Sequence, residues 1–400
     1  MRVALFGFGS WPHTQRWANA VSDRGHEVVL VWDRREFSDE HLAAYRESVV
    51  HHLHDPPSRD HLTRLPLAGW HARRLGEELR PDLVHALWLS LHGWTAQSSG
   101  VRPLVLSALG TDVLELEGMS VGPTPVDRLH AAYMARRTRS AVAEADVIFA
   151  DSTTLADRVR AQVPNARTEI VRFGVETTDI ARRGGADWRQ RLEIEEDAFV
   201  LLSSRLVRPN YNIDTIIRAL PLIRGEVPNA TLVLKYVPRA SNSDYARICL
   251  ELAETLGVLD AVRVVGELER DELLELHAVA DVYVSAPTTD GTAVSVLEAM
   301  AAGVPVVATD APGIDPVILR NDETALLVPV RDPEALAAAL GRLACDDKLR
   351  SRLAEKALEV VRREGDFDRE LDKAVLLYEE LVSAQRMRGG AVTAEREREA

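Results

Sequence analysis

Residues 281–312 read DVYVSAPTTDGTAVSVLEAMAAGVPVVATDAP, and they carry the clearest structural signal in the chain. The apolar runs near its two ends are short and rich in valine, so they predict buried strands at Val282–Ser285 and Val306–Ala308. Between them, a turn at Gly291–Thr292 precedes a helix that we expect to begin near Ala293. A strand, a helix and a second strand in this order form one βαβ unit of a parallel sheet.

The same alternation of short strands and amphipathic helices runs through the rest of the chain and is interrupted once. A loop rich in Gly, Arg and Asp, at Asp179–Asp187, separates the two series. The predicted fold class is α/β, with two doubly wound Rossmann-like domains facing across a cleft. The expected domains are residues 1–180 and 181–365. Residues 386–400 have no apolar face, so we expect a disordered tail there.

The composition excludes several classes of protein. The 400 residues suffice for two domains with separate cores, and 46% hydrophobic with 28% charged residues is ordinary for a soluble globular protein. A net charge of −14 argues against nucleic acid as a partner. Two cysteines are too few for a disulfide framework, and this scarcity is typical of proteins in the reducing cytoplasm. The first residues predict a strand rather than a signal peptide, and no apolar run approaches the roughly 20 residues that span a bilayer.

Two carboxylates flank the first turn of the predicted helix. Glu298 is the only charged residue between Asp290 and Asp310, and its neighbours are apolar. A buried carboxylate there needs hydrogen-bond donors, which a ribose diol supplies. Asp290 could accept from other hydroxyls, and the free N–H groups of the helix suit a diphosphate. The alternative is structural: Glu298 pairs with an arginine and Asp290 caps a turn.

The spacing of these carboxylates resembles the E-x7-E motif of retaining GT-B glycosyltransferases of family 4, with Asp290 in place of the first Glu. Residues 297–313, LEAMAAGVPVVATDAPG, are similar to that family's usual continuation. The resemblance implies that Asp290 contacts the donor sugar and Glu298 the ribose. It also implies that the backbone amides between them contact sugar and phosphate, namely those of Gly291, Thr292, Ala293, Val294 and Ser295.

Other segments extend the resemblance over nearly the whole chain. They are residues 13–28 (HTQRWANAVSDRGHEV), 81–88 (PDLVHALW), 109–114 (LGTDVL), 203–220 (SSRLVRPNYNIDTIIRAL) and 262–268 (VRVVGEL). The resemblance implies that residues 1–180 bind the acceptor and 181–365 the nucleotide sugar. It also implies that a C-terminal helix, residues 366–385, packs back on the first domain.

The resemblance assigns further residues to the site. Arg205 and Arg208 would stabilise the departing diphosphate, and Leu268 would contact the base through its backbone. Asp112 is the retained aspartate of the family's HGxD segment and is a candidate catalytic residue.

The loop GFGSWPH (residues 7–13) would face the phosphates and the acceptor. Gly9 and Ser10 are its expected contacts. His13 either acts on the acceptor or caps the following helix.

Three departures from the family pattern concern polar contacts. Asn210 stands near the position of the family's phosphate-binding lysine, and Leu109 replaces the histidine of HGxD. The strand that ends at Lys235 continues into YVPRAS without the usual Gly-rich turn, and Lys235 could contribute to phosphate binding.

Three other features allow two readings each. HHLHD (residues 51–55) invites a metal site, but strand alternation sends His52 and His54 to one face and His51 to the other, so a polar strand end is favoured. His85 ends a strand and is a site candidate. The arginines at 136, 137 and 139 could touch a membrane surface, but a solvated helix face is favoured.

The sequence therefore predicts a glycosyltransferase. It would move a sugar from a nucleotide-diphosphate sugar, UDP-sugar above all, to an acceptor hydroxyl or amine, with retention and without metal or cofactor. The acceptor would be a small molecule, a lipid or a glycan. A non-catalytic sugar-nucleotide sensor or partner subunit, or an epimerase on the same fold, is the alternative. A pyridoxal-dependent phosphorylase would need a lysine in the cleft, and only Lys235 lies near.

Overall fold

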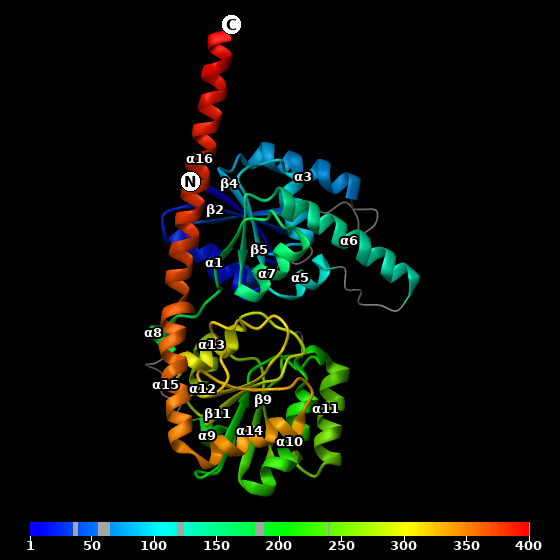
Figure 1. The fold of residues 1–400 in the computed structure, drawn as a ribbon, viewed down its shortest axis with the longest axis vertical. Coiled ribbons are helices and arrows are strands. Elements are labelled where there is room, and N and C mark those ends of the chain that lie inside the picture. Colours follow the sequence, from blue (N-terminus) through cyan, green and yellow to red (C-terminus); the bar gives the residue numbers. More distant parts are fainter. Residues whose placement is uncertain (35–38, 55–64, 118–123, 181–187, 239–240, 400) are drawn as a thin grey trace. The chain divides into compact units, whose positions relative to one another are not determined.

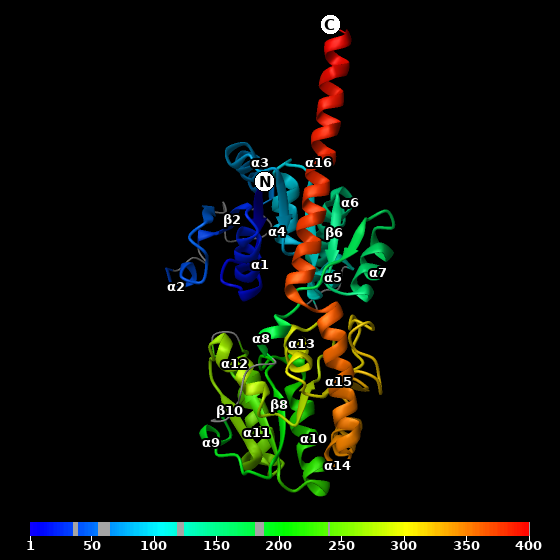
Figure 2. The ribbon, with the colours of Figure 1, turned by 90° about the vertical axis from the view of Figure 1, so that its left-hand side faces the viewer.

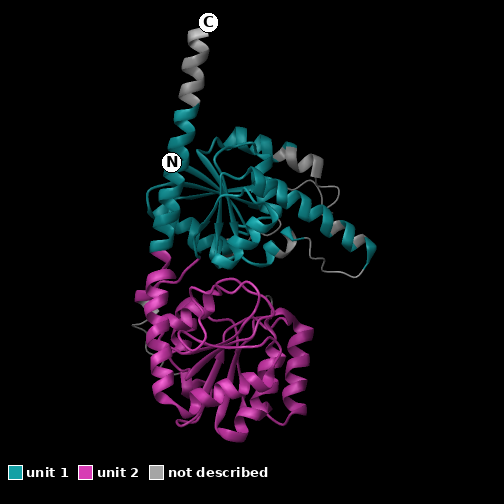
Figure 3. Ribbon diagram, in the orientation of Figure 1, with its two compact units in different colours: residues 1–172, 369–400 teal, residues 173–368 magenta. Residues whose placement is uncertain are grey.

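The computed structural model describes residues 1–34, 39–54, 65–117, 124–180, 188–238 and 241–399. The chain forms two compact units: unit 1, residues 1–172 with 369–400, and unit 2, residues 173–368 (Figure 3). The observed boundary lies ahead of the predicted one at residue 180. Residues 181–187, which hold most of the predicted linker, lie outside the described residues.

Unit 1 contains a seven-stranded sheet in the order β3-β2-β1-β4-β5-β6-β7, in which every neighbouring pair is parallel (Figure 1). Its strands are nearly continuous apolar runs, because helices cover both faces of a parallel sheet. The strands are β1 (Arg2–Phe6), β2 (Glu27–Asp33), β3 (Val49–His54), β4 (Leu83–Ala86), β5 (Leu104–Ala108), β6 (Val147–Ala150) and β7 (Thr168–Ile170).

The helices of unit 1 lie on both sides of this sheet (Figure 2). They are α1 (Pro12–Asp23), α2 (Asp39–Leu42), α3 (Leu65–Leu79), α4 (Leu91–Ser98), α5 (Thr111–Leu116), α6 (Pro125–Glu144) and α7 (Thr153–Gln162). Leu75 of α3, Trp94 of α4 and Leu155 of α7 share one core with the sheet. The start of α6 is fixed by a capping box between Thr124 and Asp127.

Unit 2 contains a six-stranded parallel sheet in the order β10-β9-β8-β11-β12-β13. The strands are β8 (Phe199–Ser203), β9 (Ala230–Lys235), β10 (Val262–Val265), β11 (Val282–Ser285), β12 (Val306–Thr309) and β13 (Leu326–Val328). The predicted α/β class with two doubly wound domains is confirmed.

The helices of unit 2 bury two separate cores. They are α8 (Thr177–Ile180), α9 (Trp188–Arg191), η2 (Pro209–Tyr211), α10 (Ile213–Glu226), α11 (Ser243–Thr255), η3 (Leu259–Ala261), α12 (Arg270–His277), α13 (Val294–Ala301), α14 (Pro333–Cys345) and α15 (Asp347–Glu364). Residues of α10, α11 and α14 pack on one face of the sheet, residues of α9, α12 and α13 pack on the other, and α15 contributes to both cores.

The last helix, α16 (Phe367–Glu399), begins in unit 2 and continues along unit 1. Within unit 1, Tyr378 of α16 accepts a hydrogen bond from Trp17 Nε1 at 3.1 Å. The chain is helical through Glu399, whereas the sequence predicts a disordered tail from residue 386. The segment is rich in Ala, Arg and Glu, which are strong helix formers, and extending an existing helix needs no new nucleus.

Each sheet reverses its strand order once. The reversal lies between β1 and β4 in unit 1 and between β8 and β11 in unit 2. Such switch points open a crevice at the carboxyl ends of the strands, where doubly wound proteins bind ligands. The loops that follow these four strands are therefore the first places to look for a site.

Candidate functional site

The loop after β11 is held by backbone and side-chain hydrogen bonds to two other segments of unit 2, the end of β12 and the η2 segment. Thr309 Oγ1 donates to Pro287 O at 2.7 Å, and Asn212 Nδ2 donates to Ala286 O at 2.9 Å. Thr288 N donates to the carbonyl of Asn210 at 2.9 Å. The loop therefore has a fixed path at the switch point, next to the loop that follows β8.

Helix α13 begins at Val294, with Ala293 as its N-cap, which agrees with the predicted start. No side chain caps this end. Glu298 lies one turn inside the helix and is 5% exposed, between the fully buried Leu297 and Ala299. The expectation of a carboxylate buried among apolar residues is confirmed.

Arg205 and Asp290 form an ion pair across the switch point. Arg205 follows β8 and Asp290 follows β11, and Arg205 Nη2 lies 2.8 Å from Asp290 Oδ2. The two side chains are only 10% and 19% exposed. The guanidinium also lies over the ring of Tyr211, 3.9 Å from its centroid, and Arg205 Nη1 lies 3.5 Å from Ser295 Oγ. Arg205 is thus held in place by residues of the loop after β11, of η2 and of α13.

The electrostatics of this pair follow from its burial. Burial raises the pKa of Asp290, and the guanidinium of Arg205 opposes that rise. Burial is the largest single effect on the pKa of Arg205 and lowers it, but Asp290, Tyr211 and Tyr283 together raise the pKa above its ordinary value. Asp290 Oδ1 accepts from Gly291 N at 3.0 Å. Each partner therefore favours the ionised form of the other.

A buried polar layer lies beneath the pair, and the sequence did not single it out. Tyr283 of β11 shares a hydrogen bond with Ser204, 3.1 Å between their hydroxyl oxygens. His277 stacks on the ring of Tyr283 with centroids 5.7 Å apart, and both side chains are fully buried. Burial lowers the pKa of His277 to about 4. These buried side chains are neutral and support the charged residues that lie next to them.

Lys235 ends β9, the strand next to β8, and its side chain is half-buried. The register pairs Leu234 with Ser203, so Lys235 lies at the same carboxyl edge as Ser204 and Arg205. Burial lowers the pKa of Lys235, the charge of Glu298 raises it, and the charge of Arg205 lowers it further. Lys235 therefore belongs to the same cluster as Arg205, Asp290 and Glu298.

The remaining predicted donor residues of unit 2 lie at the same edge of the sheet with different exposures. Gly291 and Thr292 are buried, whereas Ala293, Val294 and Ser295 are half-buried in the first turn of α13 or just before it. Leu268 is half-buried after β10. Arg208 is exposed at the start of η2.

The GFGSWPH loop follows β1 at the switch point of unit 1. A Cβ on Gly9 would lie 1.8 Å from the ring of Trp32, so this position has room for glycine alone. Tyr45 Oη donates to Gly9 O at 2.6 Å. Ser10 and His13 are half-buried, and His13 lies in the first turn of α1.

An aromatic cluster occupies the same switch point. Phe8 stacks on Trp11 with centroids 4.4 Å apart, and Trp11 meets Trp88, which follows β4, edge to face at 5.5 Å. His92 packs edge-on against Phe8 at 4.4 Å. All four rings are half-buried. The sequence analysis noted the glycines of this loop but missed its aromatic residues.

Asp112, a candidate catalytic residue from the sequence, is held by backbone amides of unit 1. Its side chain is fully buried. One carboxylate oxygen accepts from the amides of Leu109, Gly110 and Val113 at 2.9–3.1 Å, and the other accepts from Leu89 N at 3.1 Å. The carboxylate binds the loop after β5 to the loop after β4, which explains why aspartate is needed there.

His85, a site candidate from the sequence, is held inside unit 1. It is fully buried, with Nε2 2.8 Å from Ser107 Oγ and Nδ1 2.6 Å from Tyr378 Oη. Burial lowers the pKa of His85 to about 3. These hydrogen bonds tie α16 to the sheet of unit 1.

Other features of the described residues do not form a second centre of this kind. No group of three or more His, Cys, Asp or Glu side chains among them could hold a metal ion, and Asp55 of HHLHD lies outside the described residues. None of their helices is long and apolar enough to cross a bilayer. On α6, Arg139 Nη2 donates to Gln162 Oε1 at 3.0 Å.

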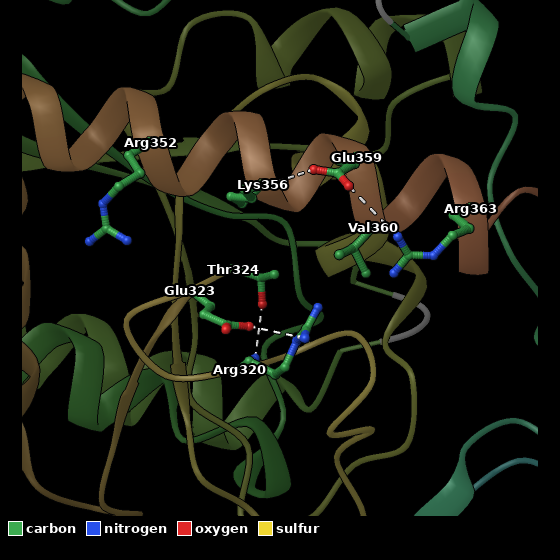
Figure 4. Close-up of a pocket in the computed structure, with 8 residues that line it drawn as sticks. All are labelled: Arg320, Glu323, Thr324, Arg352, Lys356, Glu359, Val360 and Arg363. Carbon is green, nitrogen blue, oxygen red and sulfur yellow. Dashed lines mark hydrogen bonds and ion pairs between the residues drawn. The ribbon is translucent and has the colours of Figure 1, made fainter.

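A cavity of about 260 Å³ lies between α15 and the segment 320–324 (Figure 4). Arg320 pairs with Glu323 at 3.0 Å, and Lys356 pairs with Glu359 at 2.8 Å. None of the predicted donor residues lines it. Most of its charges are exposed and paired, whereas Arg352 donates to the carbonyl of Asp322 at 2.8 Å, so we assign it to surface electrostatics rather than to the donor site.

Two family models match the chain. Residues 186–360 match the family described as "Glycosyl transferases group 1". Residues 2–150 match the family described as "Glycosyl transferase 4-like". The two matches correspond to the two units of the structure.

Relatives whose names state an activity align with residues of both units. The chain is 31% identical over 323 residues to the D-inositol 3-phosphate glycosyltransferase of Salinispora arenicola, covering 76% of this chain and 69% of the relative. It is 29% identical over 322 residues to the D-inositol 3-phosphate glycosyltransferase of Salinispora tropica. That alignment covers 77% of this chain and 65% of the relative, just under two thirds of its length.

Solved structures share the fold. The sucrose-phosphate synthase of Thermosynechococcus elongatus superposes with a TM-score of 0.77 at 19% identity, covering 96% of this chain and all of the other. HepE of Anabaena, in a crystal structure with UDP, superposes with a TM-score of 0.75 at 18% identity, covering 95% of this chain and all of the other. At these sequence identities the structural similarity is evidence for the fold alone.

Proposed function

The chain belongs to the group 1, family 4-like glycosyltransferases of the GT-B fold, and we propose that it moves a sugar from a nucleotide-diphosphate sugar to an acceptor. The observation that carries the proposal is the polar cluster at the switch point of unit 2. Arg205, Asp290 and Glu298 lie there on three elements around the start of α13. Two carboxylates, a guanidinium and a helix N-terminus are complementary to the hydroxyls and the diphosphate of such a donor.

Each group of the cluster suits one part of the donor. Glu298 accepts from the two ribose hydroxyls, which supply the donors that a carboxylate in an apolar setting needs. Asp290 accepts from hydroxyls of the sugar. The amides of the first turn of α13, with those of Gly291 and Thr292, donate to the diphosphate. A UDP-sugar is the donor we favour, since the structurally similar HepE was crystallised with UDP.

Catalysis in this proposal is mainly electrostatic. Negative charge grows on the diphosphate as the bond to the sugar breaks, and fixed cations and amides stabilise that charge without reorganising. Arg205 is held by Asp290 and Tyr211 before any donor arrives. Donor binding therefore replaces the ion pair between Arg205 and Asp290 by two new contacts. The phosphate oxygens bind Arg205, and the sugar hydroxyls bind Asp290. We also propose that the reaction retains the anomeric configuration and needs neither metal nor cofactor.

Unit 1 is proposed to bind the acceptor. The rings of Phe8, Trp11 and Trp88 at its switch point offer apolar edges and faces of the kind that pack against sugar and cyclitol rings. The Salinispora relatives are named for an inositol phosphate acceptor. A cyclitol or sugar hydroxyl is therefore the first acceptor to test.

The proposal is tested by incubating the full chain with UDP-, GDP- and dTDP-sugars, with and without inositol phosphate. We expect slow release of one nucleoside diphosphate without acceptor and faster release with a productive acceptor. Binding of a nucleotide sugar with no turnover under any condition would contradict the proposal and favour a sensor. Formation of a second nucleotide sugar would favour an epimerase.

A further inference from the structure

The donor site needs positive charge for a diphosphate, and its two arginines are poorly placed to supply all of it. Arg205 already compensates Asp290 at 2.8 Å and lies flat on Tyr211. Arg208 is exposed at the start of η2. Asn210 has no charge, and its backbone carbonyl is occupied by Thr288. The two arginines of the loop after β8 therefore leave part of the diphosphate's negative charge without a compensating cation.

Lys235 has the properties that this role requires. It ends β9, directly beside the end of β8, and so reaches the carboxyl edge from the opposite side to Asp290. Its side chain is half-buried, and among the described residues its ammonium group makes no hydrogen bond and no ion pair within 4 Å. An unpaired ammonium group at the edge of the sheet where the donor is proposed to lie is available to donate to an anionic ligand.

The charges around Lys235 place that ligand. Glu298 attracts the ammonium group and Arg205 repels it, so Lys235 lies near both the residue proposed for the ribose and the residue proposed for the phosphate. The group that joins ribose to sugar in the donor is the diphosphate. Burial also lowers the pKa of Lys235, and a bound anion would reverse that shift.

We propose that Lys235, at the end of β9, binds the donor's diphosphate in this protein. It would replace the phosphate-binding lysine of the family, near whose position after β8 this chain has Asn210. The proposal rests on the proposed function and deepens it. It assigns a donor-binding residue from a different strand to the same site. A lysine suits the task because its ammonium group acts as a point charge with three donors, which adapt to phosphate oxygens.

The alternative is that Lys235 serves Glu298 only, by neutralising that carboxylate. The two roles differ in what the ligand must contain. A lysine that binds the diphosphate matters for a nucleoside diphosphate and not for the nucleoside. A lysine that only supports Glu298 matters for both, because both contain the ribose.

The test compares Lys235→Met with the unmodified chain by NMR or calorimetric titration with UDP, GDP, uridine and guanosine. Lys356→Met is the matched control, since Lys356 is exposed on α15 of the same unit. For the nucleotide that the unmodified chain binds, Lys235→Met should raise the Kd of the diphosphate about tenfold to a hundredfold, the worth of a charge-assisted hydrogen bond. The Kd of the matching nucleoside should change less than twofold, which also shows that the variant is folded.

Two results would overturn the inference while leaving the proposed function intact. One is a diphosphate Kd within twofold of that of the unmodified chain. The other is an equal loss of affinity for nucleoside and diphosphate, which would assign Lys235 to the support of Glu298. If the unmodified chain binds neither UDP nor GDP, the proposed function itself fails, and the inference falls with it.

Discussion

Arg205 Nη2 lies 2.8 Å from Asp290 Oδ2 across the switch point of unit 2. The sequence assigned these residues to different parts of the donor, the arginine to the diphosphate and the aspartate to the sugar. Their pairing means that the ligand-free site is already neutral there. Donor binding therefore has to exchange one buried ion pair for two new contacts, which couples recognition of the sugar to recognition of the phosphate.

Asp290→Asn should separate these two effects. The variant removes the carboxylate that competes for Arg205, so UDP alone should bind as tightly as before or roughly threefold more tightly. Sugar transfer should fall about a hundredfold, because a charge-assisted hydrogen bond to the sugar is lost. Binding titrations with UDP and an assay of UDP release measure the two quantities.

Asp310→Asn is the control for this variant, since Asp310 follows the neighbouring strand β12 and is exposed. It should change neither quantity. Weaker UDP binding together with normal transfer in Asp290→Asn would show that the ion pair does not compete with the donor.

Arg205→Met should destabilise the protein, because it leaves a largely buried carboxylate without its cation. We expect a loss of about 2 kcal/mol in the free energy of unfolding, less than for a fully buried pair, since Asp290 can take up a proton. Urea unfolding followed by circular dichroism measures it. The double variant Arg205→Met/Asp290→Asn should regain at least half of the loss. A double variant no more stable than the single one would mean that the two charges do not depend on each other.

Much of the fold could be predicted from local patterns. The apolar runs of the strands and the turn before α13 depend on residues that are close in sequence, and Glu298 stands out because its neighbours are apolar. The helical end of α16 was missed because a polar composition was taken as disorder, although Ala, Arg and Glu favour helix.

The rest of the site depends on contacts between distant residues, which a sequence pattern does not contain. Tyr211 lies under Arg205, and Asn212 holds the loop after β11 from 74 residues away. Asn210, in the segment PNYN (residues 209–212), marked a departure from the family pattern after β8, but the sequence did not show which residues this segment contacts. Asp112 matched a family motif, but the motif gave no sign that backbone amides of two loops would surround its carboxylate.

Tyr378→Phe should loosen α16 from unit 1. The hydroxyl bonds both His85 Nδ1 at 2.6 Å and Trp17 Nε1 at 3.1 Å, and its removal leaves buried polar groups without a partner. A loss of about 1–3 kcal/mol in the free energy of unfolding is expected. Leu376→Ala is the control on the same helix, because Leu376 is 59% exposed. An equal effect of the two variants would contradict the assigned role of the hydroxyl.

Acid should destabilise both units through their buried histidines. Burial lowers the pKa of His85 to about 3 and of His277 to about 4, below the ordinary value of 6.5. Below pH 6.5 the unfolded chain therefore binds protons that the folded chain does not, and stability falls as the pH falls toward 4. Each histidine should cost about 2 kcal/mol at pH 5 relative to pH 7.5. Urea midpoints measured across this range should decrease, and a constant or rising midpoint would contradict the assignment.

The most direct test of the account is nucleotide binding by Glu298→Gln. The glutamine has nearly the same shape, so the fold should be kept, but a neutral amide accepts more weakly from the ribose hydroxyls. Glu323→Gln, an exposed change in the same unit, is the control. The account predicts that the Kd of Glu298→Gln for UDP or GDP rises at least tenfold, the worth of about 1.4 kcal/mol, while the control binds normally. Normal nucleotide binding by folded Glu298→Gln would show that the donor ribose does not lie on α13, and the proposed site would be wrong.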